Sequence, residues 1–208
     1  MAGVSDRLAT QLLLISRDPA TGRLRHPGVL DIGLRAALFT DLLLNGHISQ
    51  QRGGPFAEEM GVDNDRILDA VLRTVERRPG VAWSRWFRHV RVDRTALVGE
   101  LVDAGRWTEE GGLSPRYHDE QSDAALAHAE SLRQIAELHA QPGTAGEGVL
   151  AILTVMCGSI TGRPRPRALR RELDPLLTQL VRPEVTGTVY LPRMLRGAAQ
   201  RIRRPLRR

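Results

Sequence analysis

The chain has 208 residues, of which 41% are hydrophobic and only 4% aromatic, and its formal net charge is +6. This length and apolar content exclude a disordered chain and predict one domain with a hydrophobic core. Cys157 is the single cysteine, which excludes an intramolecular disulfide. The longest apolar stretch, residues 148–162, is shorter than a membrane span and is predicted to be a buried helix.

A succession of Leu- and Ala-rich segments predicts an all-α fold, a compact multi-helix bundle. Apolar residues recur at three- and four-residue spacing in most of these segments, as on the buried face of a helix. Turn residues predict a loop at 50–56 and a small β-hairpin near 111–120. The predicted helices cover, in chain order, residues 5–16, 30–45, 64–78, one or two helices within 82–104, then 122–140, 147–160, 167–182 and a basic amphipathic helix from Pro192 onward.

The positive charge is concentrated at the C-terminal end of the chain. Residues 185–208 contain seven arginines and no acidic residue, whereas residues 1–184 carry 23 arginines and 24 acidic residues. A basic end of this kind indicates a phosphate-bearing partner, either nucleic acid or an anionic membrane surface, or else a solvated tail. We therefore divide the chain into a helical domain, residues 1–184, and a basic tail, residues 185–208.

The residues that carry most enzyme chemistry do not fall into a recognisable pattern. The six histidines form no HExxH motif and no pairing with cysteine, so no metal site is predicted. Cys157 lies in an apolar segment and is predicted to be a buried, inert thiol. The glycine-rich segment 143–148 lacks the Gly-Lys-Ser/Thr ending of a phosphate-binding loop. We therefore expect neither enzyme activity nor a cofactor.

Two arginines near a predicted helix start are harder to explain by structure alone. Neither Arg91 nor Arg94 has an acidic residue three or four positions away that could neutralise it on a helix. The helix dipole disfavours cations at this end, unless a bound anion such as phosphate compensates both. In the second helix, Arg35 is the only basic residue, and it is either a phosphate ligand or the partner of Asp31.

Several segments resemble the Golgi phosphoprotein 3 family in their order and spacing. Residues 11–25 resemble the Leu-rich opening segment of the family and the acidic, Thr-Gly turn that follows it. Residues 33–48 resemble its Gly-Leu-Arg helix, and residues 91–107 resemble its Arg-x-x-Arg helix, which ends in Leu-Val-x-x-Gly. Residues 151–162 and 167–181 resemble its late core helices. The resemblance covers roughly residues 6–182, nearly the whole chain.

The resemblance implies a helical bundle with a small β-hairpin that mediates self-association, so a homo-oligomer is one expected state. The eukaryotic members of the family read phosphatidylinositol 4-phosphate on Golgi membranes. The Gly-Leu-Arg motif assigns one headgroup-binding position to Arg35, and Arg-x-x-Arg assigns the others to Arg91 and Arg94. The Golgi members carry a Trp nine residues before the first of these arginines, where this chain has His26, which is therefore a further candidate.

From these observations we expect a peripheral membrane adaptor that binds an anionic phospholipid headgroup similar to phosphatidylinositol 4-phosphate. Its expected partners are an anionic phospholipid membrane surface and the cytoplasmic tails of membrane proteins. Its expected location is the cytoplasm, on the inner face of the plasma membrane. The alternative is a regulator that binds nucleic acid through the basic tail, although no segment resembles a helix-turn-helix motif. The arginines expected to face the membrane are Arg193, Arg196, Arg201, Arg203 and Arg204.

Overall fold

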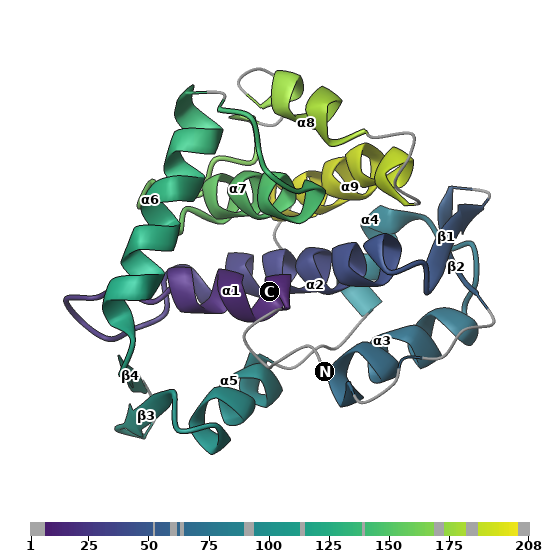
Figure 1. Cartoon of the computed structure of the whole chain (residues 1–208). Coiled ribbons are helices and arrows are strands. Elements are labelled where there is room, and N and C mark those ends of the chain that lie inside the picture. Colours follow the sequence, from purple (N-terminus) through teal and green to yellow (C-terminus); the bar gives the residue numbers. More distant parts are fainter. Residues whose placement is uncertain are drawn as a thin grey trace.

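The computed structural model of the protein describes residues 7–51, 53–58, 62, 65–89, 94–112, 115–138, 140–168, 173–181 and 187–203. These residues form nine α-helices and two small antiparallel sheets, which confirms the predicted helical bundle. Helices α1 (Leu8–Ile15) and α2 (Pro27–Leu44) lie side by side in the middle of the molecule (Figure 1). The other helices are α3 (Arg66–Glu76), α4 (Trp83–His89), α5 (Arg94–Asp103), α6 (Ser122–Leu138), α7 (Ala145–Cys157), α8 (Asp174–Leu180) and α9 (Leu191–Arg203).

Helix α2 is the centre of the bundle, because α1, α3, α4, α7 and α9 all pack against it. It begins three residues earlier than the sequence predicts, since Pro27 occupies its first turn rather than the loop before it. Proline is favourable there because its missing N–H group would have no helical partner in any case. After the helix, Gly46 adopts a φ of 75°, as predicted for a residue that ends a helix.

Two β-hairpins flank the helices. Strands β3 (Trp107–Glu110) and β4 (Arg116–Asp119) pair antiparallel, so the predicted hairpin exists but begins four residues earlier than expected. Strands β1 (Ile48–Gln51) and β2 (Gly54–Ala57) also pair, so the loop predicted at 50–56 is wrong. A hairpin can form there because Gly53 adopts a φ of 92° at the turn.

Helices α4 and α5 are separate, which answers the question that the sequence left open for residues 82–104. Helix α4 contributes three aromatic side chains, and all three contact Phe39 of α2 edge to face, with ring centroids 5.2 to 6.0 Å apart. Aromatic pairs in this geometry add favourable energy beyond the area that they bury. These contacts hold α4 on α2; the three side chains are Trp83, Trp86 and Phe87.

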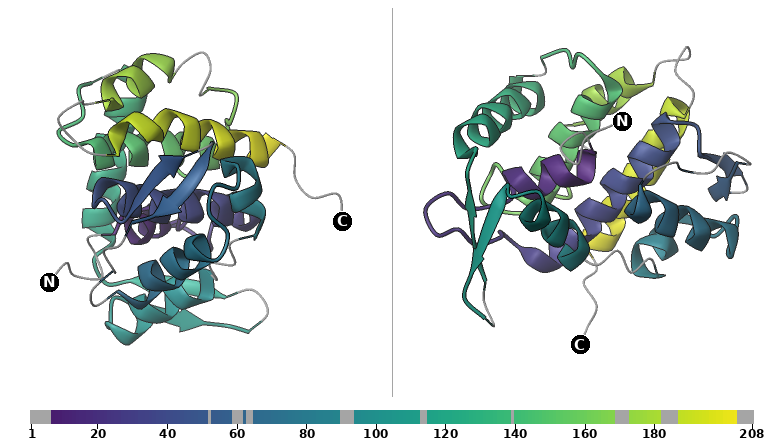
Figure 2. Two further views of the ribbon diagram at one scale, coloured as in Figure 1. Left: turned by 90° about the vertical axis from the view of Figure 1, so that its right-hand side faces the viewer. Right: turned by 60° about the horizontal axis from the view of Figure 1, so that its bottom comes forward.

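The basic end of the chain is folded onto the bundle as far as the structure describes it. Helix α9 lies alongside α2 (Figure 2) and packs on both α2 and α4 through its apolar face. Contact with α4 is close at Gly197, where an added Cβ would lie 2.8 Å from the Cβ of Trp83. The boundary predicted after residue 184 falls within 182–186, outside the described residues, and stays a prediction. Among the described helices, none is long and apolar enough to cross a membrane.

Candidate anion-binding site

The start of helix α2 is open and carries no carboxylate of its own first turn. His26 is the N-cap residue, adopts a φ of 46°, and makes no capping hydrogen bond with its side chain. Instead, its ring Nε2 lies 2.9 Å from the carbonyl oxygen of Gly162. A Cβ added at Gly28 would meet no atom within 4 Å, so the space beside the first turn is free. Backbone N–H groups and the helix dipole make such an end favourable for an anion.

Arg94 reaches this helix start from another part of the chain. It is the first residue of α5, and its Nη1 lies 3.0 Å from the carbonyl oxygen of Pro27 and 3.0 Å from Oδ1 of Asp31. The charge of Arg94, which no neighbour on its own helix could neutralise, is therefore partly neutralised across the fold. The contacts described for Arg94 use only Nη1, and the guanidinium has further N–H donors on Nε and Nη2.

Arg35 lies one turn after Asp31 on the same helix. Its Nη1 donates a hydrogen bond to the carbonyl oxygen of Phe87 at 2.7 Å, while its buried Nε has no partner among the residues described. Burial lowers the pKa of the Arg35 guanidinium, nearby Asp31 opposes this shift, and nearby Arg201 adds to it. The guanidinium remains charged at neutral pH. We call Arg35, Arg94 and Asp31 the arginine cluster.

The arginines of α9 divide between two faces. Arg193, Arg196 and Arg203 are exposed, whereas Arg201 is only 9% exposed and belongs to the face that packs on α2. Arg201 is therefore not part of the exposed membrane-facing set that the sequence suggested. The pattern could have revealed this, because Arg201 follows Ala198 by three residues on the apolar stripe of the helix.

The structure thus brings together some of the predicted site residues. Arg94 pairs with Asp31, and the charge of Asp31 also acts on Arg35, whose own hydrogen bond is with Phe87. His26 is the residue before Pro27, to which Arg94 bonds. Two further candidates, Arg91 and Arg204, lie outside the described residues. Sequence reasoning had treated Asp31 only as an alternative partner of Arg35, and its ion pair with Arg94, 63 residues away, carries no local sequence signal.

A known protein family matches the chain. The model of the Golgi phosphoprotein 3 (GPP34) family matches residues 8–202, nearly the whole chain. The chain belongs to this family. The match runs from the first residue of α1 almost to the end of α9, so the family pattern extends beyond the segments that had suggested the resemblance. A search of curated proteins found no match.

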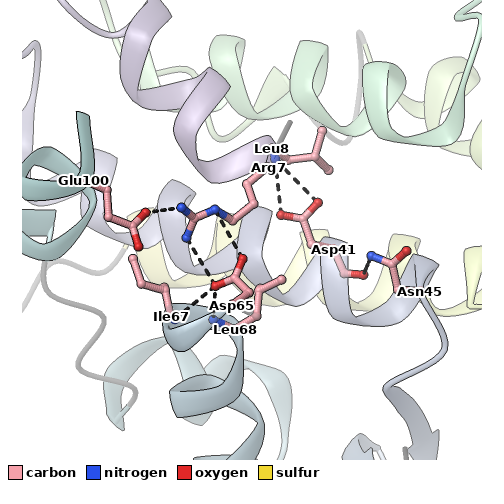
Figure 3. Close-up of polar contacts among 8 residues, drawn as sticks. All are labelled: Arg7, Leu8, Asp41, Asn45, Asp65, Ile67, Leu68 and Glu100. Atoms are coloured by element: carbon pink, nitrogen blue, oxygen red, sulfur yellow. Dashed lines mark hydrogen bonds and ion pairs between the residues drawn. The ribbon is translucent and has the colours of Figure 1, made fainter. Parts of the chain in front are cut away.

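A second polar cluster joins residues of α2 and α5 to the starts of α1 and α3, and the sequence did not predict it. Arg7, just before α1, is 8% exposed and forms ion pairs with Asp65 and Glu100 (Figure 3). Asp65 also caps α3 by accepting hydrogen bonds from two of its first N–H groups at 2.9 and 3.0 Å. Beside them, Asp41 of α2 accepts a hydrogen bond from the N–H of Leu8 at 3.2 Å. We call Arg7, Asp41, Asp65 and Glu100 the Arg7 network.

Asp41 is the group of this network whose protonation is most altered by folding. Burial raises its pKa to about 7, and the negative charge of Asp65 adds to this, while the hydrogen bond from Leu8 and the charge of Arg7 oppose it. The folded protein therefore keeps a proton on Asp41 up to about pH 7, whereas the unfolded chain releases it near the ordinary value of 3.8. At a pH between these two values, unfolding releases a proton. The free energy of unfolding therefore falls as the pH rises through this window, and it stops falling above the upper value.

This pH dependence should disappear when Asp41 is replaced by Asn, which keeps an oxygen for the N–H of Leu8. For the parent, we expect the free energy of unfolding to fall by up to about 3 kcal/mol between pH 5 and pH 8, with most of the fall below pH 7. Asp41→Asn should show a flatter profile and exceed the parent in stability at pH 8. Urea denaturation at four pH values measures this. Asp103→Asn, at an exposed carboxyl on α5, should leave the slope as in the parent, and a parent-like slope in Asp41→Asn would contradict the assignment.

Cys157 is a buried thiol, as predicted. It is 1% exposed, and burial raises its pKa to about 12, so the thiolate is not formed at neutral pH. Its sulfur packs against Gly33 of α2, where an added Cβ would lie only 2.4 Å away. The residue therefore fills space between α2 and α7.

Proposed function

We propose that this protein is a peripheral membrane adaptor whose arginine cluster binds the phosphate of an anionic phospholipid headgroup, similar to phosphatidylinositol 4-phosphate. The observation that carries the proposal is that Arg94 of α5 reaches Asp31 and the carbonyl of Pro27 at the open start of α2, one turn before Arg35 on the same helix. Membership of the Golgi phosphoprotein 3 family supports it.

The cluster has the chemistry that a phosphate requires. Arg94 pairs with Asp31, and Arg35 lies one turn after Asp31 on α2, so the three side chains together carry one net positive charge. Asp31 holds the Nη1 side of Arg94, and the remaining donors of that guanidinium fork suit two phosphate oxygens. The uncapped first turn of α2 adds the positive end of the helix dipole. Arg91, three residues before Arg94, is expected to add a third cation.

The exposed face of α9 would supply attraction that does not depend on the headgroup. Arg193, Arg196 and Arg203 are all exposed on this helix. Each arginine close to an anionic leaflet contributes on the order of 1 kcal/mol. Because the apolar face of α9 is buried against α2 and α4, the helix would contact a membrane through these charges and not by inserting its apolar side chains.

The test is vesicle co-sedimentation with neutral lipid, with phosphatidylserine, and with phosphatidylinositol 4-phosphate in a neutral background. Replacing both Arg91 and Arg94 by Gln should weaken binding to the phosphoinositide vesicles by about tenfold or more, because charge-assisted hydrogen bonds are lost. Replacing Arg203 by Gln should weaken binding to both anionic vesicles by about fivefold, in a salt-dependent way.

A matched control is Arg73→Ala, which removes an exposed arginine of α3 that pairs with Asp69 on its own helix. It should bind like the parent. Equal binding by the Arg91/Arg94 double variant would exclude the arginine cluster as the headgroup site. Failure of the parent to bind any anionic vesicle, with salt-sensitive binding to duplex DNA instead, would favour the nucleic-acid alternative.

A further inference from the structure

A second acid-free basic segment lies between α7 and α8. Residues 148–171 contain five arginines and no acidic residue. Three of these arginines alternate with prolines, and all three are exposed: Arg163, Arg165 and Arg167. We call residues 163–167 the Arg-Pro segment. Because like charges this close repel one another, their accumulation on the surface favours contact with an anionic partner.

The backbone that leads into the Arg-Pro segment is fixed against α7. The chain turns back so closely at Gly158 that an added Cβ would lie 2.5 Å from the carbonyl carbon of Arg163. The N–H of Arg165 donates a hydrogen bond to the carbonyl oxygen of Val155 at 3.2 Å, and the hydroxyl of Thr161 donates one to the carbonyl oxygen of Arg163 at 2.8 Å. The two prolines restrict the backbone further. The segment therefore presents its charges to a partner at a small cost in conformational entropy.

The loop before the Arg-Pro segment contacts the residues that open α2. Nη1 of Arg25 donates a hydrogen bond to the carbonyl oxygen of Ser159 at 2.8 Å. Nε2 of His26 lies 2.9 Å from the carbonyl oxygen of Gly162, and Arg163 follows Gly162 directly in the chain. The first arginine of the segment thus begins beside the N-cap residue of α2.

The arginine cluster lies at this same end of α2. Nη1 of Arg94 lies 3.0 Å from the carbonyl oxygen of Pro27, the residue after His26. The loop of the Arg-Pro segment and the first residue of α5 therefore contact consecutive residues of α2, although they are far apart in the chain. Positive charge from two separate elements gathers around one helix start.

Helix α9 adds a further exposed arginine at this end. Just before α9, Gly187 approaches the last turn of α2, where an added Cβ would lie 2.1 Å from a carbonyl oxygen. Further along α9, Gly197 meets Trp83, whose ring contacts Phe39, about one turn earlier on α2. Helix α9 therefore runs antiparallel to α2 and carries its last residue, the exposed Arg203, towards the start of α2.

We propose that the Arg-Pro segment is a second contact of this protein with an anionic membrane, and that the protein docks with the start of α2 facing the lipid headgroups. The inference rests on the proposed function, because it places the membrane at the arginine cluster. The exposed segment would be attracted to any anionic leaflet, whereas the arginine cluster would distinguish the phosphoinositide headgroup.

The first experiment is vesicle co-sedimentation of the Arg163→Gln/Arg167→Gln variant. Since each arginine close to an anionic leaflet contributes about fivefold in affinity, this variant should bind about twentyfold more weakly to phosphatidylserine and phosphoinositide vesicles alike. Both side chains are exposed, so the fold should be retained, which thermal denaturation checks. The control, Arg73→Gln/Arg133→Gln, removes the same charge from two exposed arginines of α3 and α6 and should bind within about twofold of the parent.

The second experiment reports which face of the protein meets the membrane. Cys157 is only 1% exposed, so a thiol-reactive fluorophore can be directed to an introduced cysteine. At Arg167→Cys, the fluorophore should be quenched at least threefold more by vesicles with a quencher on their headgroups than at Arg73→Cys. Arg73 lies in the last turn of α3, which leads to the contact of Gly80 with Pro55 beyond the other end of α2.

The outcomes separate this inference from the proposed function. Parent-like binding by Arg163→Gln/Arg167→Gln would overturn the inference and leave the arginine cluster intact, and equal quenching at positions 167 and 73 would overturn the orientation. If this variant bound phosphatidylserine weakly while the Arg91/Arg94 double variant bound like the parent, the segment would be supported and the headgroup site overturned. Binding of the parent to duplex DNA and to no vesicle would overturn both.

Discussion

Replacing Arg7 by Ala should lower the free energy of unfolding by about 3 to 5 kcal/mol at pH 8, the cost of breaking a buried ion pair from one side. The variant leaves Asp65 and Glu100 without the cation that both contact, and Asp41 without a nearby positive charge. The loss should be smaller at pH 5. At that pH Asp41, whose pKa burial raises to about 7, is protonated, so it carries no charge that the missing cation would have to oppose. Urea denaturation at both pH values measures the difference.

An exposed ion pair of the same chemistry provides the control for this experiment. Arg73 pairs with Asp69 on α3 at 2.9 Å, but its side chain is 65% exposed. Arg73→Ala should therefore cost about 0.5 kcal/mol or less, with little dependence on pH, because water screens the pair. If the Arg7 and Arg73 variants lost similar amounts of stability, the Arg7 network would not hold the helices together.

Replacing Gly187 by Ala should lower the free energy of unfolding by about 2 to 5 kcal/mol for two additive reasons. The residue adopts a φ of 88°, which costs other residues about 1 to 2 kcal/mol. In addition, an added Cβ would lie 2.1 Å from the carbonyl oxygen of Leu43, so the backbone entering α9 would be pushed away from α2. Thermal and urea denaturation measure the total loss.

Gly105 separates the two causes. It has a similar φ, 67°, but an added Cβ there would meet no atom within 4 Å. Gly105→Ala should therefore show the conformational cost alone, about 1 to 2 kcal/mol. If Gly105→Ala and Gly187→Ala lost equal amounts of stability, the contact with Leu43 would contribute nothing. The segment that leads into α9 would then not pack on α2 as described.

Much of the fold follows from local patterns in the sequence. Three- and four-residue apolar spacing predicts most of the helices, and the apolar run at 148–162 predicts the buried α7. The errors have local causes as well. The second helix is predicted from residue 30, although it begins at Pro27, which is favourable in a first turn. The hairpin around Gly53 has too few apolar residues to give a strand pattern.

The candidate site is predictable only in its parts. The position of Arg94 near a helix start suggests an anion ligand, whereas Arg35 is read either as a second ligand or as the partner of Asp31. The contact of Arg94 with Asp31 depends on how α5 lies against α2, which no local pattern specifies. For the same reason the basic C-terminal segment is read as a tail, although α9 packs on the bundle and buries Arg201.

The sequence by itself determined the helical class, the family and the charges available for binding an anion, because these depend on residue types and on spacing along one chain. Only the tertiary structure decided which charges neutralise one another. Asp31 meets an arginine 63 residues away, and Arg7 joins Asp65 to Glu100 from 58 and 93 residues away. Electrostatic interaction falls with distance in space and is strengthened by burial, and neither quantity can be read from position in the chain.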